Sequence, residues 1–318
     1  MILPQRLPDP AEVGPPAPVL LEADRERVSA ALEASRAPAT RRAYTAAWER
    51  WQSWCDARGL RAMPAQPEAV AAFLAERHAL GRSAATLGVD RAGIAAAHRA
   101  SGLTDPTQHE GVRRTLAGLR RTSAPQRRVR GLSGEDLERA LAALGPGELG
   151  RRDRALLLLL RDGMLRRSEL AALTWADLAA LPDGSGRLTI RRSKTDQEGH
   201  GASLYVTART MAALEDWRPA AERRPDGAIF VALRGPRSGS ALSGEAVALA
   251  VRRSAAAAGL EGLYGGHSLR RGTAEHLAER GAQLPELMTA GRWRSASMPA
   301  LYAADAEAGR GAVARILG

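Results

Sequence analysis

The sequence predicts a mainly α-helical chain of two domains, the second of which also carries a small antiparallel sheet. Apolar residues recur at helical spacing through most of the 318 residues. Strand-like segments separated by turn residues are confined to residues 177–207. A basic, turn-rich linker at 122–132 divides the chain into two parts, and each part is long enough to bury a core of its own.

The first part, residues 22–121, is predicted to be an all-helical domain that follows a flexible, Pro- and Ala-rich arm at 1–21. Its helices are expected at 22–36, within 40–59, and at 67–80, 83–100 and 105–121. One helix carries large side chains at i, i+4, i+7 and i+11, namely Tyr44, Trp48, Trp51 and Cys55. This spacing indicates a packed core stripe rather than a platform for stacking bases.

The second part, residues 133–318, is predicted to be a mixed α/β domain that opens with a helix cap at Ser133. Helices are expected at 135–144, 151–162, 168–173, 207–217, 243–258, 268–280 and 284–290, and two short ones around Tyr302 and at 306–317. Strands are expected at 177–181, 187–194 and 202–207. The last two form a hairpin, and Lys194 lies in the loop at its tip.

The charge of the chain favours a polyanionic partner. The chain has 46 Lys plus Arg against 35 Asp plus Glu, a formal net charge of +11, and Lys194 is its only lysine. Codon bias explains arginine in place of lysine, but it does not explain the excess of basic over acidic residues. Nucleic acid is therefore the expected partner.

Several other classes of protein are not indicated. No run of about 18 apolar residues predicts a membrane span, and the N-terminus does not resemble a signal peptide. The single cysteine, Cys55, cannot form an internal disulfide or a multi-cysteine zinc site. We therefore expect a cytoplasmic protein with no membrane partner.

Two segments of the second domain could hold a phosphate. They are GMLRRSELAALTW at 163–175 and the longer segment from Gly265 to Tyr302. In the second, His267 and Arg270 are three apart at a predicted helix start, so both face the same side. Helix N-termini bind anions through unpaired N–H groups and the positive end of the helix dipole. Arg271, the next residue, is expected to face elsewhere.

These motifs resemble those of the tyrosine site-specific recombinases. The family pattern is an Arg in a G-x-x-R-x-S-E-L-like segment, a hairpin Lys, H-x-x-R, a His or Trp, and a Tyr nine residues further on. It falls here on Arg166, Lys194, His267, Arg270, Trp293 and Tyr302. The resemblance covers nearly the whole chain and implies a helical core-binding (SAM-like) domain followed by a catalytic domain. Each motif is weak alone, but six in order are specific.

The resemblance implies a role for each residue. Tyr302 is the nucleophile that forms a 3′-phosphotyrosine, and Arg166 and Arg270 clamp the phosphate. His267 donates a hydrogen bond to the phosphate or takes part in proton transfer to and from the tyrosine. Trp293, where most members have His, serves by hydrogen bonding and packing. The alternatives are a packing role for the tyrosine and surface positions for the arginines.

Lys194 is the expected general acid for the leaving 5′-oxygen. A lysine with a lowered pKa can give up a proton, whereas arginine stays charged in proteins. Neighbouring arginines would lower the pKa of such a lysine. The alternative is that the only lysine falls at this position by chance. Glu169 is expected to support the pair of arginines, or else to form an ordinary core-capping salt bridge.

The implied partner is double-stranded DNA with an inverted-repeat site, bound by a homotetramer on two duplexes, with no cofactor and no metal. The DNA-binding candidates are Arg41, Arg42, Arg127, Arg128 and Arg130. A C-terminal helix at about 306–318 is expected to dock on a neighbouring subunit, and packing within its own subunit is the alternative. The rival functions are topoisomerase IB-like strand breakage with rejoining of the same strand, and DNA binding without catalysis.

Overall fold

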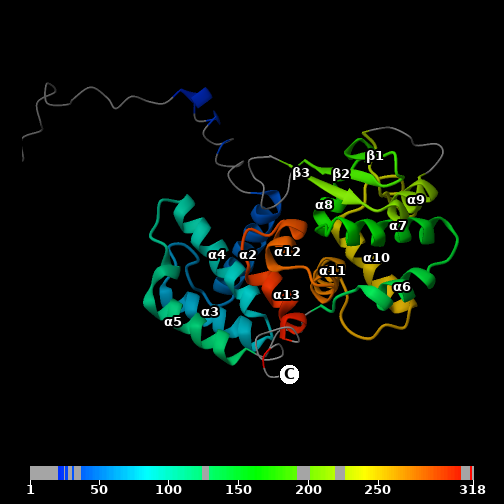
Figure 1. Cartoon of the computed structure of the whole chain (residues 1–318). Helices are drawn as coiled ribbons and strands as arrows, with labels where there is room; N and C mark the ends of the chain where they lie inside the picture. Colours follow the sequence, from blue (N-terminus) through cyan, green and yellow to red (C-terminus); the bar gives the residue numbers. More distant parts are fainter. Residues whose placement is uncertain are drawn as a thin grey trace, which may run out of the picture. The chain divides into compact units, whose positions relative to one another are not determined.

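A computed structural model describes residues 21–24, 26, 27, 31, 37–123, 129–191, 201–218, 226–308 and 316. The chain divides into two compact units, residues 1–126 and 127–318. In Figure 1 the helices of the first unit are blue to cyan and those of the second run from green to red. The predictions for residues 1–20 and for Arg127, Arg128 and Lys194 lie outside the described residues.

The first unit is a helical bundle. Its elements are α2 (Pro38–Asp56), α3 (Pro67–Ala79), α4 (Ala84–Ala100), the 3₁₀ turn η2 (Pro106–Gln108) and α5 (Glu110–Thr122). The predicted stripe on α2 is in the core, since Trp51 and Cys55 are fully buried and Trp48 packs against them. Burial, and then Asp56, raise the pKa of the Cys55 thiol to about 11.

Two buried polar side chains hold this bundle together. Asp90 on α4 is fully buried and pairs with Arg50 on α2 and Arg77 on α3, at 2.7 and 3.1 Å. His98, also buried, accepts from the backbone N–H of Ala65 at Nε2, so its Nδ1 carries the proton and donates to a carbonyl of its own helix. Asp90 and His98 therefore both have partners, as the desolvation of a buried polar group requires.

The second unit combines helices with one small sheet. Its helices are α6 (Gly134–Ala142), α7 (Glu148–Asp162), α8 (Arg167–Ala171), α9 (Ala208–Trp217), α10 (Gly244–Ala257), α11 (Ser268–Glu279), α12 (Leu284–Gly291) and α13 (Ser297–Ala308), with the 3₁₀ turn η3 (Trp175–Asp177). The central helix is α7, which contacts α9, α10 and α11 and buries its whole run from Ala155 to Leu160. A helical segment that is apolar on all of its sides has to be buried in this way.

The sheet has the order β1-β2-β3, with β1 (Leu178–Ala180), β2 (Gly186–Ile190) and β3 (Ala202–Val206). Both pairs are antiparallel, which confirms the predicted hairpin. Alternate residues of β2 face the core, with Leu188 and Ile190 buried and Arg187 and Thr189 exposed. The sheet lies beside α7 and α9 in Figure 1. The mainly α class with a small antiparallel sheet is therefore confirmed.

Several boundaries differ from the predicted ones. The helix expected at 105–121 is split, because Asp105 caps η2 and the side chain of His109 caps α5 by accepting from the N–H of Gly111. Ser133 stands at the N-cap of α6, but its side chain accepts no capping hydrogen bond. The following Gly134 has a φ of 53°, a left-handed turn that a regular helix start does not contain.

The C-terminal segments also differ. The helix expected around Tyr302 is α13, which extends to Ala308. The helix expected at 306–317 lies outside the described residues beyond 308, except for residue 316. The expected strand 187–194 ends at Ile190, and residues 192–200 lie outside the described part of the chain. None of the described helices is both long and apolar enough to cross a membrane.

The described ends of the linker predicted at 122–132 are each part of one of the two units. Thr122 is the last residue of α5, whereas the N–H groups of Arg130 and Leu132 donate to Leu263 and Ser268 of the second unit. The chain passes so close to α11 that a Cβ on Gly272 would lie 2.5 Å from the backbone nitrogen of Leu132. The absence of a side chain at Gly272 therefore allows the first residues of the second unit, at Leu132, to pack against α11.

Candidate active site

The turn before α8 brings an arginine and a glutamate together. Arg166 is the N-cap of α8, and Glu169 closes a capping box by accepting from its backbone N–H at 2.9 Å. The Arg166 guanidinium also donates to Glu169 at 2.6 Å. Glu169 therefore holds both the backbone and the side chain of Arg166 in place.

Glu169 is a buried carboxylate whose second partner is Arg292. The Nη2 of Arg292 donates to its Oε2 at 2.7 Å, and the Glu169 side chain is only 2% exposed. Burial alone would raise the pKa of Glu169, but the Arg166 N–H and the charge of Arg292 outweigh burial and hold the pKa below its usual range. Glu169 does form the salt bridge with Arg166, but its other direct partner is Arg292 rather than the expected Arg270.

Arg270 projects from the first turn of α11 and is held by two backbone carbonyls. Its Nη1 donates to Met164 at 2.5 Å, and its Nη2 donates to Gly291. Burial, and then the charges of Arg166 and Arg292, lower the pKa of Arg270 to about 10. Since this value lies well above neutrality, Arg270 is a fixed positive charge at physiological pH.

Trp293 lies between Arg270 and Tyr302. The guanidinium carbon of Arg270 is 4.3 Å from the centroid of the Trp293 ring, a cation–π contact. The Trp293 and Tyr302 rings are tilted by 58° with centroids 6.0 Å apart. A Cβ on Gly291 would overlap the indole ring, so the glycine is what admits Trp293 to this position.

Arg271 is also close to the tyrosine, contrary to the expectation that it faces elsewhere. Its guanidinium carbon lies 5.8 Å from the centroid of the Tyr302 ring. It donates to Glu275 at 2.6 Å and to the Val129 carbonyl at 2.9 Å. Arg271 therefore ties α11 to the entry of the second unit beside the helix that carries Tyr302.

His267, the N-cap of α11, is exposed, and its side chain makes no capping hydrogen bond. The structure thus places the motif residues in two sets of contacts, Arg166 with Glu169 and Arg270 with Trp293 and Tyr302. The charges of Arg166 and Glu169 act on Arg270, and His267 is three residues from Arg270 on the same helix start. Lys194 cannot be placed, because residues 192–200 are outside the described part.

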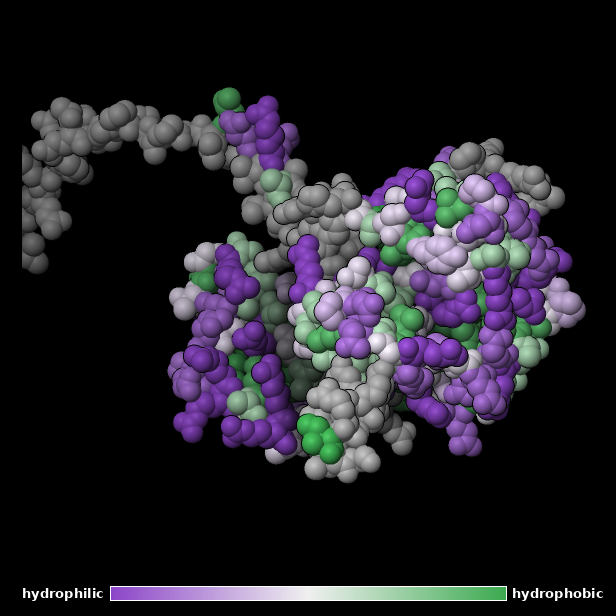
Figure 2. Space-filling view, viewed as in Figure 1, coloured by the Kyte–Doolittle hydropathy of each residue, from purple (hydrophilic) through white to green (hydrophobic). Residues whose placement is uncertain are grey.

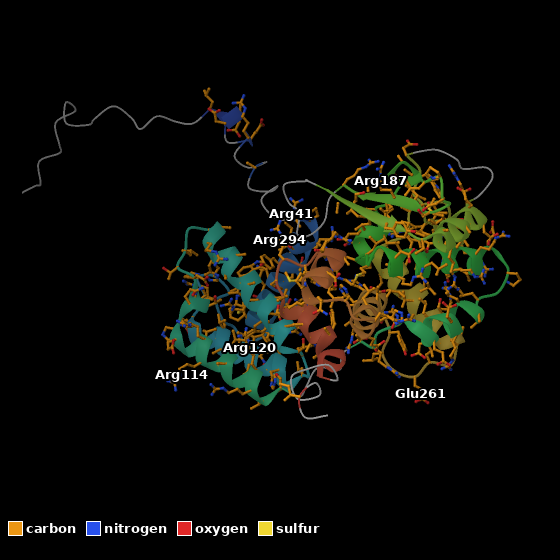
Figure 3. The ribbon with its side chains drawn as sticks, in the orientation of Figure 1. Arg41, Arg114, Arg120, Arg187, Glu261 and Arg294 are labelled. Atoms are coloured by element: carbon orange, nitrogen blue, oxygen red, sulfur yellow. The ribbon has the colours of Figure 1, made fainter. Side chains whose placement is uncertain are left out.

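The candidate DNA-binding arginines are placed differently from one another. Arg41 and Arg42 are exposed in the first turns of α2 in the first unit, and Figure 3 labels Arg41 there. Arg130 is exposed too, but its Nη1 donates to the Glu261 carbonyl at 2.7 Å, so part of its hydrogen-bonding capacity is used within the chain. Arg127 and Arg128 lie outside the described residues.

A second group of exposed arginines, not predicted from the sequence, lies on α5. Hydrophilic side chains dominate the visible face of the first unit in Figure 2, and Figure 3 labels two arginines of α5, Arg114 and Arg120. The exposed arginines of this helix are Arg113, Arg114, Arg120 and Arg121. The two Arg-Arg pairs on an amphipathic helix could have indicated this basic surface from the sequence.

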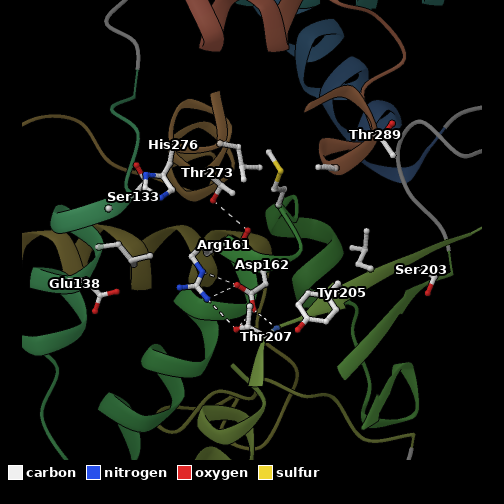
Figure 4. Close-up of a pocket in the computed structure, with 16 residues that line it drawn as sticks. Ser133, Glu138, Arg161, Asp162, Ser203, Tyr205, Thr207, Thr273, His276 and Thr289 are labelled. Atoms are coloured by element: carbon white, nitrogen blue, oxygen red, sulfur yellow. Dashed lines mark hydrogen bonds and ion pairs between the residues drawn. The ribbon is translucent and has the colours of Figure 1, made fainter. Parts of the chain in front are cut away.

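A cavity of about 670 Å³ in the second unit is lined in part by residues next to the site (Figure 4). One wall is Met164, whose carbonyl binds Arg270, and the wall beside it is Thr289 and Ala290 of α12. Asp162 also lines the cavity and accepts from the N–H and the hydroxyl of Thr207, both at 2.8 Å. The cavity is therefore lined by one of the two residues whose carbonyls orient Arg270.

Comparison with known proteins identifies the relatives of this chain. The sequence profile described as the phage integrase family matches residues 130–308. An integrase/recombinase XerD homolog of Selenomonas ruminantium is 31% identical over 285 residues, which cover 85% of this chain and 83% of the relative. The recombinase Cre of Escherichia phage P1 is 24% identical over 294 residues, covering 84% of each chain. Position 293 carries Trp where most members of the family have His, which favours a likeness to Cre. At this identity the likeness is a distant one.

Solved structures with the same fold include two complexes with DNA. XerH bound to a palindromic difH substrate has a TM-score of 0.59 and 20% identity, covering 80% of this chain and 73% of XerH. A lambda integrase fragment bound to a COC′ core site has a TM-score of 0.58 and 21% identity, covering 89% of this chain and 95% of the fragment. At these identities the match shows the shared fold.

Proposed function

Since the chain belongs to the phage integrase family, the DNA breaking and rejoining enzymes called tyrosine recombinases, we propose that Tyr302 is its nucleophile in site-specific recombination. The observation that supports this role is the contact series from Arg270 through Trp293 to Tyr302, at 4.3 and 6.0 Å. It brings a fixed cation and a phenol to one site. A tyrosine that served only as packing would not need a buried arginine nearby.

The proposed reaction conserves the energy of the phosphodiester bond. The Tyr302 oxygen forms a bond to phosphorus, the bond to the 5′-oxygen breaks, and a 3′-phosphotyrosine remains. The 5′-oxygen takes up a proton and leaves as a hydroxyl. The 5′-hydroxyl of a second duplex then attacks the phosphotyrosine and displaces Tyr302, so strands are exchanged without ATP.

Arg166 and Arg270 are proposed to bind the non-bridging oxygens, where negative charge gathers in the transition state. Both are pre-positioned, Arg166 by Glu169 and Arg270 by the carbonyls of Met164 and Gly291. Pre-positioned donors do not have to reorganise as the charge develops, which is why they lower the barrier. His267, exposed at the start of α11, would donate to the same phosphate. Trp293 would add its indole N–H as a hydrogen-bond donor and keep Tyr302 packed.

Lys194 is proposed as the general acid that protonates the 5′-oxygen. Lys194→Arg keeps the charge and removes an accessible proton. We expect this variant to cleave ordinary DNA slowly and to recover on a 5′-bridging phosphorothiolate, whose leaving group needs no proton. Cleavage of ordinary DNA at the wild-type rate would contradict the role.

The proposed partner is duplex DNA with an inverted-repeat site. XerH on its palindromic substrate and lambda integrase on its core site are relatives in fold that are seen with DNA. Phosphate contacts from the exposed arginines, together with Arg127 and Arg128, would make the affinity fall steeply with salt. The inverted repeat can be sought directly in the DNA that flanks the gene.

We further propose a tetramer on two sites, linked by a C-terminal segment at about 306–318 that docks on the neighbouring subunit. Its apolar residues Val313, Ile316 and Leu317 recur at helical spacing. Deletion of residues 306–318 should abolish assembly on paired sites. Survival of both cleavage and assembly would contradict docking between subunits.

The test of the function is a duplex with a nick near the cleavage site, which traps the covalent adduct because the short released strand diffuses away. The wild-type chain should form a protein–DNA adduct, and Tyr302→Phe should not. No adduct from the wild type would contradict the proposal and favour DNA binding without catalysis. Relaxation of supercoils without exchange between sites would favour the topoisomerase-like alternative.

A further inference from the structure

We propose that Arg292 is a positioning residue. It holds Glu169 in place, and Glu169 in turn holds Arg166 in the orientation in which Arg166 binds the scissile phosphate. The inference deepens the proposed function and rests on it. Arg292 lies between Gly291 and Trp293, at the end of α12. The pattern of motifs in the sequence assigned it no role.

The backbone of Arg292 is in a conformation that favours glycine. It is the C-cap of α12 with φ 54° and ψ 47°, in the left-handed region. Among the described non-glycine residues, only Met164 shares a positive φ, at 43°. A Cβ is unfavourable in this region, so an arginine here needs a side-chain interaction that offsets the cost.

The side chain of Arg292 supplies two such interactions. Its Nη1 donates to the Gly163 carbonyl at 2.9 Å, and its Nη2 donates to Glu169 at 2.7 Å. The side chain is 12% exposed and that of Glu169 is 2% exposed, so the ion pair is largely shielded from water. Shielding strengthens the attraction and makes the loss of either partner more costly.

Hydrogen bonds link two turns of the site, the one after α7 that contains Met164 and the one after α12 that contains Arg292. Both residues have a positive φ. Arg292, in the turn after α12, binds Gly163 in the turn after α7. Arg270 of α11 donates to one carbonyl in each of the same turns, Met164 and Gly291. The two guanidinium groups thus fix the spacing between the turn that leads to Arg166 and the turn that leads to Trp293.

Charge explains why a second cation is needed at Glu169. The carboxylate accepts the Arg166 N–H and the Arg292 Nη2 on Oε2, and the Arg166 Nη1 on Oε1. With Arg292 absent, Arg166 would be the only direct cationic partner of a buried anion and would be drawn more strongly toward it. With Arg292 present, two arginines pair directly with one carboxylate, and the surplus positive charge remains for a phosphate.

The planar guanidinium group of arginine, with donors on two Nη atoms, suits this position. The two acceptors, a carbonyl of one turn and a carboxylate of α8, lie on different segments and bind different Nη atoms. A lysine ammonium keeps the charge but lacks the planar fork that reaches both acceptors in a fixed geometry. We therefore expect Arg292→Lys to retain only part of the effect.

The experiment is single-turnover cleavage of the nicked duplex by wild type, Arg292→Gly and Arg292→Lys, at saturating and at limiting enzyme. Gly fits the left-handed backbone and so offsets part of the cost of the lost ion pair, and Arg292→Gly should fold with a thermal midpoint somewhat below that of the wild type. Its saturating rate should fall about 10–100-fold, a typical loss for an outer-shell partner. The enzyme concentration for half-maximal cleavage should change little, since DNA binding uses other contacts.

Two further measurements separate positioning from a merely structural role. On a duplex with a neutral methylphosphonate at the scissile position, the deficit of Arg292→Gly should shrink, because the oxygens that Arg166 grips carry less charge. In a Glu169→Gln background, Arg292→Gly should cost little more, because the partner through which it acts is already altered. The matched control is Arg209→Ala, which breaks an exposed Arg–Glu pair with Glu138 in the same unit and should leave the rate within about twofold.

A wild-type chain that forms no adduct contradicts the proposed function, and this inference with it. An active wild type with an equally active Arg292→Gly variant contradicts this inference alone. Simple additivity of the losses from Arg292→Gly and Glu169→Gln would also overturn the positioning role. So would a rate loss that tracks a fall in the thermal midpoint and disappears at low temperature.

Discussion

The guanidinium of Arg270 lies 4.3 Å from the ring centroid of Trp293, and the same ring faces Tyr302 at 6.0 Å. One side chain thus contacts both the arginine that would bind the phosphate and the tyrosine that would attack it. Displacement of the ring should therefore disturb both groups at once. A Cβ at Gly291 provides a way to displace the ring without changing either side chain, although the Gly291 carbonyl also accepts from Arg270.

Gly291→Ala should reduce cleavage, because its new Cβ would overlap the Trp293 indole. The expected loss is at least about tenfold in the single-turnover rate, in line with misplacement of a catalytic group. The control is Gly88→Ala in the interior of α4, where a Cβ meets nothing within 4 Å. That variant should cleave normally and be more stable by about 0.5–1 kcal/mol. An unchanged rate for Gly291→Ala would show that the indole can move without consequence.

Glu169→Gln should make the protein less stable at neutral pH than the wild type, and the difference should vanish in acid. The native pKa of Glu169 lies below its value in the unfolded chain, which is about 4.3 for an unperturbed glutamate. Its stabilisation is therefore present above the unfolded pKa and is lost as the pH falls through the native pKa. Thermal midpoints of the two proteins from pH 7 down to pH 3 measure this convergence. A constant difference across that range would rule out the ion pairs as its source.

Cys55 should be inert in the folded protein. It is fully buried in the first unit, and burial together with Asp56 raises the pKa of its thiol to about 11, so little thiolate exists at pH 8. A disulfide reagent that reports free thiols should react slowly with the native chain and rapidly in denaturant. Since the chain has one cysteine, the signal reports opening of the first unit alone. Rapid reaction of the native chain would contradict the described packing of α2.

The sequence was a good guide to the elements and to the motif residues, because both are local patterns. The stripe on α2 and the hairpin of β2 and β3 follow from spacing alone. The split between η2 and α5 was also local, since it depends on caps at Asp105 and His109, but the apolar pattern obscured it. Arg292 could not be predicted in the same way, because its role depends on Glu169, 123 positions away, and on a left-handed backbone.

Arg271 and Gly291 were missed for a related reason. Neighbours on a helix are assumed to face different sides, yet Arg271 reaches the Tyr302 ring because α13 packs along α11. Gly291 reads as an ordinary helix stop, and only the packing of Trp293 shows why a side chain is excluded there. Motif spacing identifies the groups that bear the chemistry, whereas the groups that orient them emerge from tertiary contacts.

The most direct test of the nucleophile is to locate the covalent bond in the adduct. The chain has four tyrosines, so Tyr44→Phe, Tyr205→Phe and Tyr264→Phe are matched controls for Tyr302→Phe. With the nicked duplex labelled on either side of the cleavage site, the protein should retain the strand that ends in a 3′-phosphate, and only Tyr302→Phe should abolish the adduct. Mass spectrometry of the digested adduct should place the nucleotide on the peptide containing Tyr302. An adduct that survives in Tyr302→Phe, or one attached to a 5′-phosphate, would contradict the central claim.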